Sequence, residues 1–155
     1  ARAAVAQEFH LTLKFLGEIT EEACATTAQM LRAVTAQDAP FVVHLEGVGA
    51  FPSVDAPRVV WVGLAEGQEV VARLACAIEQ GSRSLHLRED TRSFSPHLTL
   101  GRVRAARRRG ALAQQLRTVL WTSPHPWRVE SLTLYQSALT SQGPRYTVLA
   151  DVPLV

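Results

Sequence analysis

The chain has 155 residues, of which 47% are hydrophobic, so it is long enough to form one globular domain with a buried core. Its apolar runs are much shorter than the roughly 20 residues that cross a bilayer, and no signal-like segment opens the chain, which argues against a membrane or exported protein. The formal net charge of +2 hides an asymmetry, because residues 1–96 carry 8 Lys and Arg against 12 Asp and Glu (net −4), whereas residues 97–155 carry 8 against 2 (net +6).

The first half of the chain predicts a strand, a helix and two further strands. HLTL, beginning at His10, alternates polar and apolar residues with the period of a half-buried strand. Residues 20–34 predict an amphipathic helix, with Thr20 as its N-cap. VVHLEGV at 42–48 and VVWVGL at 59–64 predict strands, and FPSVDAP between them has the composition of a turn.

Residues 67–81 predict a second amphipathic helix, with Gly81 as its C-cap. This helix leads into a second HLTL tetrapeptide that begins at His97. The two cysteines, Cys24 and Cys76, lie in predicted helices without C-x-x-C spacing. We therefore expect buried free thiols in a reducing cytoplasm and neither a disulfide nor a zinc site.

Residues 106–121 predict a third helix, although Gly110 and the arginines at its start weaken it. Its apolar face is expected to contain Leu112, Leu116, Val119 and Leu120. Residues 127–137 and 144–152 predict strands joined by the turn TSQGP. The stretch GRVRAARRRG holds five arginines, which suit an anion such as RNA and equally suit a solvated surface.

The chain contains an internal repeat. The two HLTL tetrapeptides are 87 residues apart, and the Pro-Arg pairs at 57–58 and 144–145 are displaced by the same number. Residues of about 10–64 and 97–152 each predict strand, helix, strand, turn and strand, so we expect a bilobal α+β fold with two pseudo-symmetric antiparallel sheets, helices on the outer faces and a central cleft. By symmetry a strand and helix should precede His10. Only nine residues do, so either a segment is missing or that sheet has one strand fewer.

The two H-x-T pairs are the predicted site. Residues i and i+2 of a strand point the same way, so each histidine shares a face with its threonine, and approximate symmetry would bring both pairs to one groove between the lobes. Two imidazoles can supply a general acid and a general base, and threonine hydroxyls can stabilise charge on a phosphate oxygen. One H-x-T alone is usually only a polar strand face. A metal site is the weaker alternative, because no carboxylate or cysteine accompanies either motif. The four residues are His10, Thr12, His97 and Thr99.

The segments FHLTLKFLGE, GAF…PRVVWVGL, FSPHLTLGRVR and SLTLYQSAL…GPRYTVL resemble the RNA 2′,3′-cyclic phosphodiesterases of the 2H phosphoesterase superfamily, the LigT-like group formerly described as 2′-5′ RNA ligases. The similarity runs from about residue 8 to the C-terminus. It implies a bilobal α+β fold, metal-independent hydrolysis of an RNA 2′,3′-cyclic phosphate to a 2′-phosphate, and in some members reversible 2′-5′ joining of RNA ends.

The resemblance implies one acid and one base. We expect His10 to protonate the departing 3′-oxygen and His97 to activate water, although the symmetry of the motifs leaves the reverse assignment open. Lys14 would face the same groove if the strand stays regular, and is otherwise an exposed strand-end lysine. Arg102 follows the second motif, where the family also places an arginine, and suits bidentate phosphate contact. Aromatic residues that could stack on a base are Phe15, Phe51 and Tyr135, although aromatic residues at strand ends are more often part of the core.

The sequence therefore predicts a cytoplasmic, monomeric cyclic phosphodiesterase without cofactor or metal, acting on RNA with 2′,3′-cyclic phosphate ends such as tRNA fragments. One alternative is a relative that opens a cyclic phosphate on a small nucleotide. Another is an RNA-binding module that keeps the groove without catalysis. His44, His86 and His125 have no partner pattern and are expected to be structural.

Overall fold

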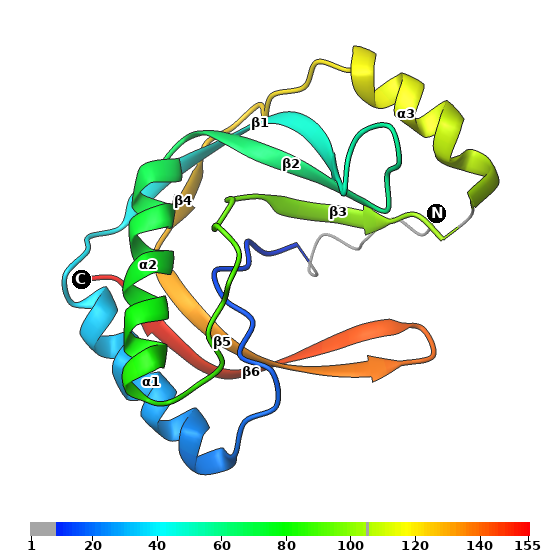
Figure 1. Ribbon diagram of the computed structural model, residues 1–155. Helices are drawn as coiled ribbons and strands as arrows, with labels where there is room; N and C mark the ends of the chain where they lie inside the picture. Colours follow the sequence, from blue (N-terminus) through cyan, green and yellow to red (C-terminus); the bar gives the residue numbers. More distant parts are fainter. Residues whose placement is uncertain (1–8, 105) are drawn as a thin grey trace. The chain divides into compact units, whose positions relative to one another are not determined.

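The computed structural model describes residues 9–104 and 106–155, and it confirms the predicted α+β class. The elements, shown in Figure 1, are α1 (Glu21–Thr35), β1 (Phe41–Phe51), β2 (Val59–Glu66), α2 (Gln68–Ser84), β3 (Leu98–Arg102), the 3-10 helix η2 (Ala106–Arg108), α3 (Arg109–Thr118), β4 (Trp127–Val129), β5 (Ser131–Thr140) and β6 (Gly143–Pro153). One sheet has the strand order β3-β2-β1-β4, and β5 pairs antiparallel with β6 in a second. No helix within the described ranges has the length and apolar character needed to span a bilayer.

The chain divides into two compact units, each built from three separate segments. Unit 1 contains residues 9–12, 42–69 and 95–127 of the described chain, and unit 2 contains residues 13–41, 70–94 and 128–155. The segment before residue 9, where a preceding strand and helix were expected, lies outside the described residues.

The curled sheet of unit 1 has one apolar face. Val62 of β2 is paired with Leu98 of β3, and both side chains are buried, as is Ala50 of β1. Because these residues lie on one face by strand alternation, the side chains of their chain neighbours are left on the other face. The functional motifs lie on that second face.

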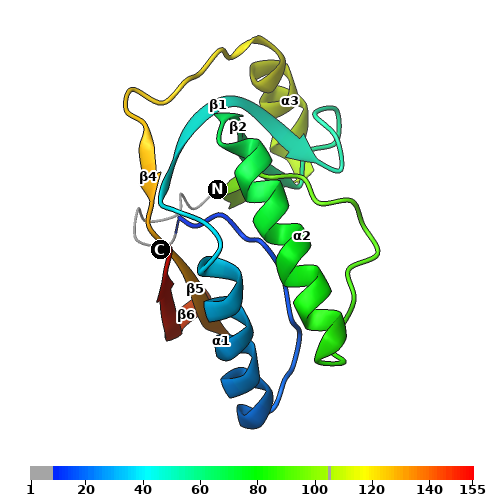
Figure 2. The same cartoon turned by 90° about the vertical axis from the view of Figure 1, so that its left-hand side faces the viewer.

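In unit 2 helix α1 packs on the β5–β6 hairpin, as Figure 2 shows, and side chains of α2 take part in the same buried cluster. Leu132 and Leu134 of β5 share one strand face, and Leu132 is paired with Val152 of β6. Each fully buried aliphatic side chain of such a core contributes about 1.5–3 kcal/mol. The buried cluster consists of Leu31, Leu74, Ile78, Leu132, Leu134 and Val152.

The predicted order of elements recurs, but the repeats and the compact units do not coincide. The first HLTL segment, which forms only an isolated bridge at Leu11, is followed by α1, β1 and β2, and the second is followed by η2, α3, β4, β5 and β6. The single strand predicted at 127–137 is divided at Glu130 into β4 and β5, which belong to different sheets. Yet α1 packs on β5 and β6 in unit 2, whereas β1, β2 and α3 belong to unit 1. Each unit therefore combines elements of both repeats, which differs from the expected arrangement of one repeat per lobe. The physical reason is that the apolar face of α1 is buried on the hairpin of the other repeat.

The start of α1 is as predicted, because the Thr20 hydroxyl accepts a hydrogen bond from the Ala23 N–H at 3.1 Å. The predicted end of α2 is wrong. Gly81 lies inside the helix, where a Cβ would be 2.5 Å from the Met30 Cγ, so glycine is needed for the close approach of α1. The helix continues to Ser84, and the chain leaves it through His86, whose φ of 55° is left-handed, with the Leu87 N–H bonded to the Ser82 carbonyl.

Helix α3 is shorter than predicted. It ends at Thr118, and Val119 is already extended, so Leu120 is 97% exposed instead of lying on the buried face. Its buried residues are Ala113 and Leu116. A first turn without acidic residues or a capping side chain gives this helix little support from its own sequence.

Both cysteines are free, but they are less buried than expected. Cys24 is half-buried and Cys76 is exposed. In α2, Cys76 lies between the buried Leu74 and Ile78 in sequence, and a helix turns by about 100° per residue, so its side chain is on the opposite side of the helix. The expectation of a buried thiol is therefore wrong for Cys76.

Candidate active site

An antiparallel bridge joins the two HLTL tetrapeptides through Leu11 and Leu98, the second residue of each. Figure 1 shows the segment around Leu11 running beside β3. Residues directly opposite each other in antiparallel strands point to the same side, so both leucines share one face and their chain neighbours share the other. The side chains on that second face are those of His10, Thr12, His97 and Thr99.

The register at this bridge sets the spacing of the four groups. Continued by one residue on each side of the bridge, an antiparallel register would put His10 opposite Thr99 and Thr12 opposite His97. Directly opposite residues have Cβ atoms about 4.5–5.5 Å apart, and diagonal neighbours, the relation that this register would give His10 and His97, are about 7–8 Å apart. Two imidazoles at diagonal positions leave room for one phosphate group between them. All four residues belong to unit 1, so the motifs adjoin within one unit instead of facing each other from two lobes.

The ring of His97 is oriented by its own backbone. Its Nδ1 lies 2.7 Å from the carbonyl oxygen of Ser95. A carbonyl oxygen only accepts hydrogen bonds, so Nδ1 must carry the proton when the ring is neutral, and the lone pair is then on Nε2. This tautomer gives His97 a free basic nitrogen on the ring edge away from Ser95.

Two aromatic rings contact His97 on the same sheet. The Phe51 ring meets it edge-on, with centroids 4.9 Å apart and an interplanar angle of 86°, and the Trp61 centroid is 6.1 Å away. Phe51 was among the aromatic residues proposed from the sequence, whereas Trp61 was missed. Strand alternation in β2 shows which face Trp61 occupies, but only the register with β3 shows that His97 is its neighbour. Of the other candidates for stacking, Phe15 and Tyr135 lie in unit 2.

Arg102 lies on the same sheet face as the motif because of a register shift. It is the third residue after Thr99, so a regular strand would place it on the opposite face. The pairing of β2 with β3 shifts between Val60 and Trp61, and Arg102 pairs with Val59 while Thr99 pairs with Trp61. Since Val59 and Trp61 share a face, Arg102 and Thr99 share it too. The exposed guanidinium of Arg102 is thus at the end of β3 on the motif face, the sheet face that holds His97 and Thr99.

Lys14 has a different environment from the one predicted. The backbone bends at Leu13, directly after Thr12, so the strand alternation that would carry Lys14 to the motif face does not continue. Its ammonium group forms an ion pair with Glu79, and only 4% of the Lys14 side chain is exposed. The structure therefore places the single lysine in an internal salt bridge of unit 2, neither on the motif face nor at an exposed strand end.

The arginine run after β3 is mostly exposed. Arg104, Arg107 and Arg108 are exposed, and the partly buried Arg109 has an Nε without a hydrogen-bond partner in the described part of the chain. Exposed arginines next to the motif strand form a positive surface that suits a polyanion.

The side chains of the described residues do not group as metal ligands. Among residues 9–104 and 106–155, no cluster of three or more His, Cys, Asp and Glu side chains could hold a metal ion. His44, which was expected to be structural, places its Nε2 2.9 Å from the Ser123 carbonyl oxygen.

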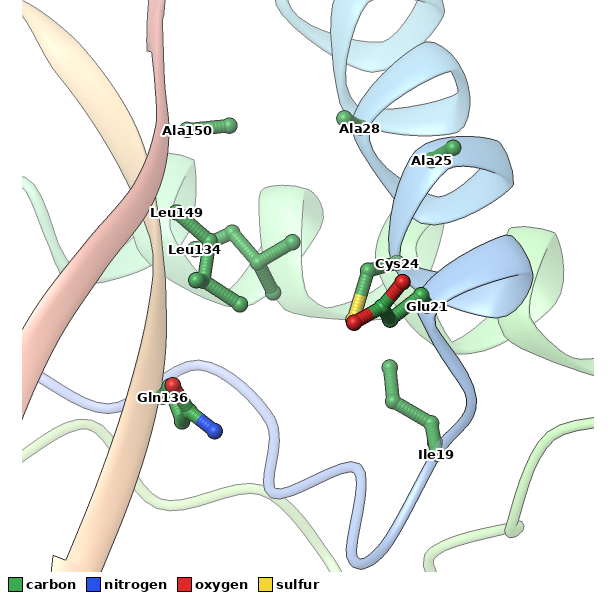
Figure 3. Close-up of a pocket in the computed structure, with 9 residues that line it drawn as sticks. All are labelled: Ile19, Glu21, Cys24, Ala25, Ala28, Leu134, Gln136, Leu149 and Ala150. Atoms are coloured by element: carbon green, nitrogen blue, oxygen red, sulfur yellow. The ribbon is translucent and has the colours of Figure 1, made fainter.

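A cavity of about 430 Å³ lies in unit 2, between α1 and the β5–β6 hairpin (Figure 3). Its walls are mainly apolar, and Cys24, Glu21 and Gln136 are its polar residues. None of the motif residues lines this cavity. The convergence of titratable groups on the sheet of unit 1, and not the size of a cavity, therefore identifies the candidate active site.

Comparison with known proteins identifies the family of the chain. Residues 2–140 match the model of the 2′-5′ RNA ligase superfamily. An RNA 2′,3′-cyclic phosphodiesterase of Aeropyrum pernix is 37% identical over 94% of this chain and 82% of its own length. The protein of the same name from Archaeoglobus fulgidus is 40% identical over 94% of this chain and 79% of its own length.

Solved structures agree on the fold. TT0787 of Thermus thermophilus superposes with a TM-score of 0.83 at 31% identity, covering 99% of this chain and 81% of that one. LigT of E. coli, crystallised with 3′-AMP, gives a TM-score of 0.77 at 25% identity over 99% of this chain and 80% of its own. With a family model over most of its length and relatives above 30% identity, the chain belongs to the 2′-5′ RNA ligase superfamily.

Proposed function

We propose that this protein hydrolyses 2′,3′-cyclic phosphates at RNA ends to 2′-phosphates. The observation that carries the proposal is the Leu11–Leu98 bridge, because it joins the two H-x-T segments and so supports a common face for two histidines and two threonines. The names of the relatives from Aeropyrum pernix and Archaeoglobus fulgidus support the same reaction and the same class of substrate.

In the proposed reaction, His97 and His10 act as base and acid. The Nε2 of His97 takes a proton from water as its oxygen attacks the phosphorus, and the bond from phosphorus to the 3′-oxygen breaks. His10 gives a proton to the departing 3′-oxygen, so the product carries a 3′-hydroxyl and a 2′-phosphate. The Nδ1–H of His97 bonded to Ser95 supports the base role, because it leaves the lone pair on the other nitrogen.

Thr12, Thr99 and Arg102 are proposed to bind the phosphate. Threonine hydroxyls donate to the non-bridging oxygens, where negative charge increases in the transition state. The guanidinium of Arg102 can form two parallel hydrogen bonds with a phosphate. The pairing of β3 with β2 supports a common face for Thr99 and Arg102, and the Leu11–Leu98 bridge brings the segment of Thr12 beside them, whereas Lys14 is paired with Glu79.

The same groups would also join RNA ends. If a 5′-hydroxyl takes the place of water, its oxygen attacks the cyclic phosphorus, the 3′-oxygen leaves with the proton of His10, and a 2′-5′ phosphodiester forms. Excess water favours hydrolysis, so we expect joining only when a second RNA holds its 5′-hydroxyl at the site.

An assay of oligonucleotide hydrolysis tests the proposed function. An RNA ending in a 2′,3′-cyclic phosphate, incubated with the protein and EDTA, should give a 2′-phosphate product identified by ³¹P NMR, and adding a 5′-hydroxyl RNA tests for joining. Loss of activity with EDTA would support a metal enzyme instead. Faster turnover of a cyclic mononucleotide than of the oligonucleotide would favour a small-nucleotide substrate, and tight RNA binding without turnover would favour a binding module.

Replacing Arg102 with alanine should lower kcat/KM for the cyclic oligonucleotide by about 10- to 100-fold, because a hydrogen bond to a charged group contributes about 1.5–3 kcal/mol. Arg102→Lys should recover only part of the loss, since an ammonium group cannot make the bidentate contact. The matched control is Arg104→Ala, which removes a neighbouring exposed arginine. Equal losses of kcat/KM in both alanine variants would show that Arg102 contributes only general positive surface charge.

A further inference from the structure

A row of paired residues crosses the sheet next to the motif. Thr99 of β3 is paired with Trp61 of β2, and Trp61 is paired with Gly49 of β1. Directly paired residues share a face, so the indole of Trp61 is on the face of the two histidines. Trp61 therefore stands beside Thr99, and its ring has no side chain opposite it on β1.

Gly49 is what allows the indole to lie across the sheet. A Cβ at this position would be 2.3 Å from the Trp61 Cζ2 and 2.4 Å from its Cη2. Real Cβ atoms do not approach other carbon atoms so closely, so any other residue at position 49 would displace the indole. The backbone of Gly49 has no positive φ, and the glycine is needed for space and not for conformation.

The indole is held by packing and not by a hydrogen bond. Its Nε1 is buried and has no hydrogen-bond partner among the described residues. Its ring contacts are with His97, at 6.1 Å between centroids, and with Phe51, at 5.3 Å. Because Phe51 also meets the His97 ring edge-on, the three rings form one cluster.

We propose that Trp61 is a positioning residue for His97, and that Gly49 acts through Trp61. The Ser95 carbonyl holds the imidazole at Nδ1, which still allows the ring to tilt about this hydrogen bond, and the rings of Phe51 and Trp61 pack against the imidazole and limit the tilt. Together they aim Nε2 at the reacting phosphate. The proposal rests on the role of His97 in the proposed function. A misplacement of a reacting group by about 1 Å can lower the rate about 10²-fold. We therefore expect the loss of Trp61 to lower kcat and to change KM little.

The test combines steady-state kinetics with a double-mutant cycle. Trp61→Leu should lower kcat for the cyclic oligonucleotide by about 10- to 100-fold and change KM by less than about threefold. Trp61→Phe should keep most of the activity, because the lost N–H has no partner among the described residues. Gly49→Ala should lower kcat in the wild-type background but have no effect beyond about twofold in the Trp61→Leu background. Trp127→Leu, in β4, is the matched control and should leave kcat unchanged.

A second readout does not depend on activity. The ring protons of His97, assigned by NMR with the help of the His97→Ala variant, should shift when Trp61 is replaced by Leu, because the ring current of the indole is lost, and should not shift in Trp127→Leu. Unchanged His97 resonances in a folded Trp61→Leu protein would overturn the proposal, as would equal effects of Gly49→Ala in both backgrounds. If the wild type does not hydrolyse cyclic phosphates, the proposed function fails, and the NMR shifts alone decide whether Trp61 holds the ring.

Discussion

Replacing either His97 or His10 with alanine is expected to lower kcat for cyclic phosphate hydrolysis by about 10²- to 10⁴-fold. Each imidazole transfers one proton in the proposed reaction, and water replaces it poorly as a positioned acid or base. The double variant should be little worse than the more damaged single variant, because groups that act on one transition state are not additive. The measurement is kcat on an oligonucleotide with a 2′,3′-cyclic phosphate end.

The two single variants also distinguish acid from base. A phosphodiester with a phenolate leaving group needs no proton on its departing oxygen, so the loss in His10→Ala should largely disappear with such a substrate, while the loss in His97→Ala should persist. Recovery of His97→Ala in place of His10→Ala would reverse the assignment.

His125→Ala is the matched control for both histidine variants. This histidine also belongs to unit 1, but its side chain is exposed in the segment after α3. It should keep wild-type kcat on both substrates. A similar loss in all three alanine variants would mean that the histidines act on folding and not on proton transfer.

Much of the fold could be predicted from local patterns. The alternation of the second HLTL and the periodicity of residues 20–34 indicate a strand and a helix because each depends on which face of the element is buried, and both are found as β3 and α1, whereas the first HLTL forms only an isolated bridge at Leu11. The cap of α1 at Thr20 follows from one hydroxyl and its nearest N–H groups. Such features need no information from distant parts of the chain.

Several features depend on contacts between distant segments. Gly81 has the composition of a helix end, yet Met30 from another helix requires glycine there. Arg102 reaches the motif face through a register shift between β2 and β3, which no single strand reveals. Trp61 was missed as a neighbour of His97 because strand register determines that contact. Pairing of distant segments is thus the information that one sequence lacks.

Breaking the Lys14–Glu79 ion pair should have the largest effect on stability among the changes considered. The Lys14 side chain is 4% exposed and that of Glu79 20%, so the pair is intermediate between surface pairs, worth about 0–1 kcal/mol, and fully buried ones, whose disruption costs about 3–5 kcal/mol. We expect Glu79→Ala to lower the free energy of unfolding by on the order of 2 kcal/mol, because it leaves the ammonium group buried without its carboxylate.

Lys14→Met should cost less than Glu79→Ala. It removes the buried charge itself, and Glu79 keeps the N–H of Asp90 at 3.1 Å and the guanidinium of Arg83 at 3.7 Å. In the double variant Lys14→Met/Glu79→Ala, neither charge remains unpaired, so its loss should be smaller than the sum of the two. Urea unfolding of the three variants measures these differences. Additive losses would show that the two side chains do not interact.

The Lys14–Glu79 ion pair also predicts how the free energy of unfolding depends on pH. The hydrogen bond from Lys14 lowers the pKa of Glu79 below its ordinary value of 4.5, the Asp90 N–H and the charges of Lys14 and Arg83 act in the same direction, and partial burial opposes them. Because the folded state has the lower pKa, it binds fewer protons than the unfolded state, so this contribution is complete above about pH 4.5 and is lost as the pH falls through the folded pKa. In Lys14→Met the pKa of Glu79 moves back toward its ordinary value, and the unfolding free energy should fall less steeply between about pH 5 and 3 than in the wild type. Parallel pH curves for the two proteins would contradict the coupling of Glu79 to Lys14.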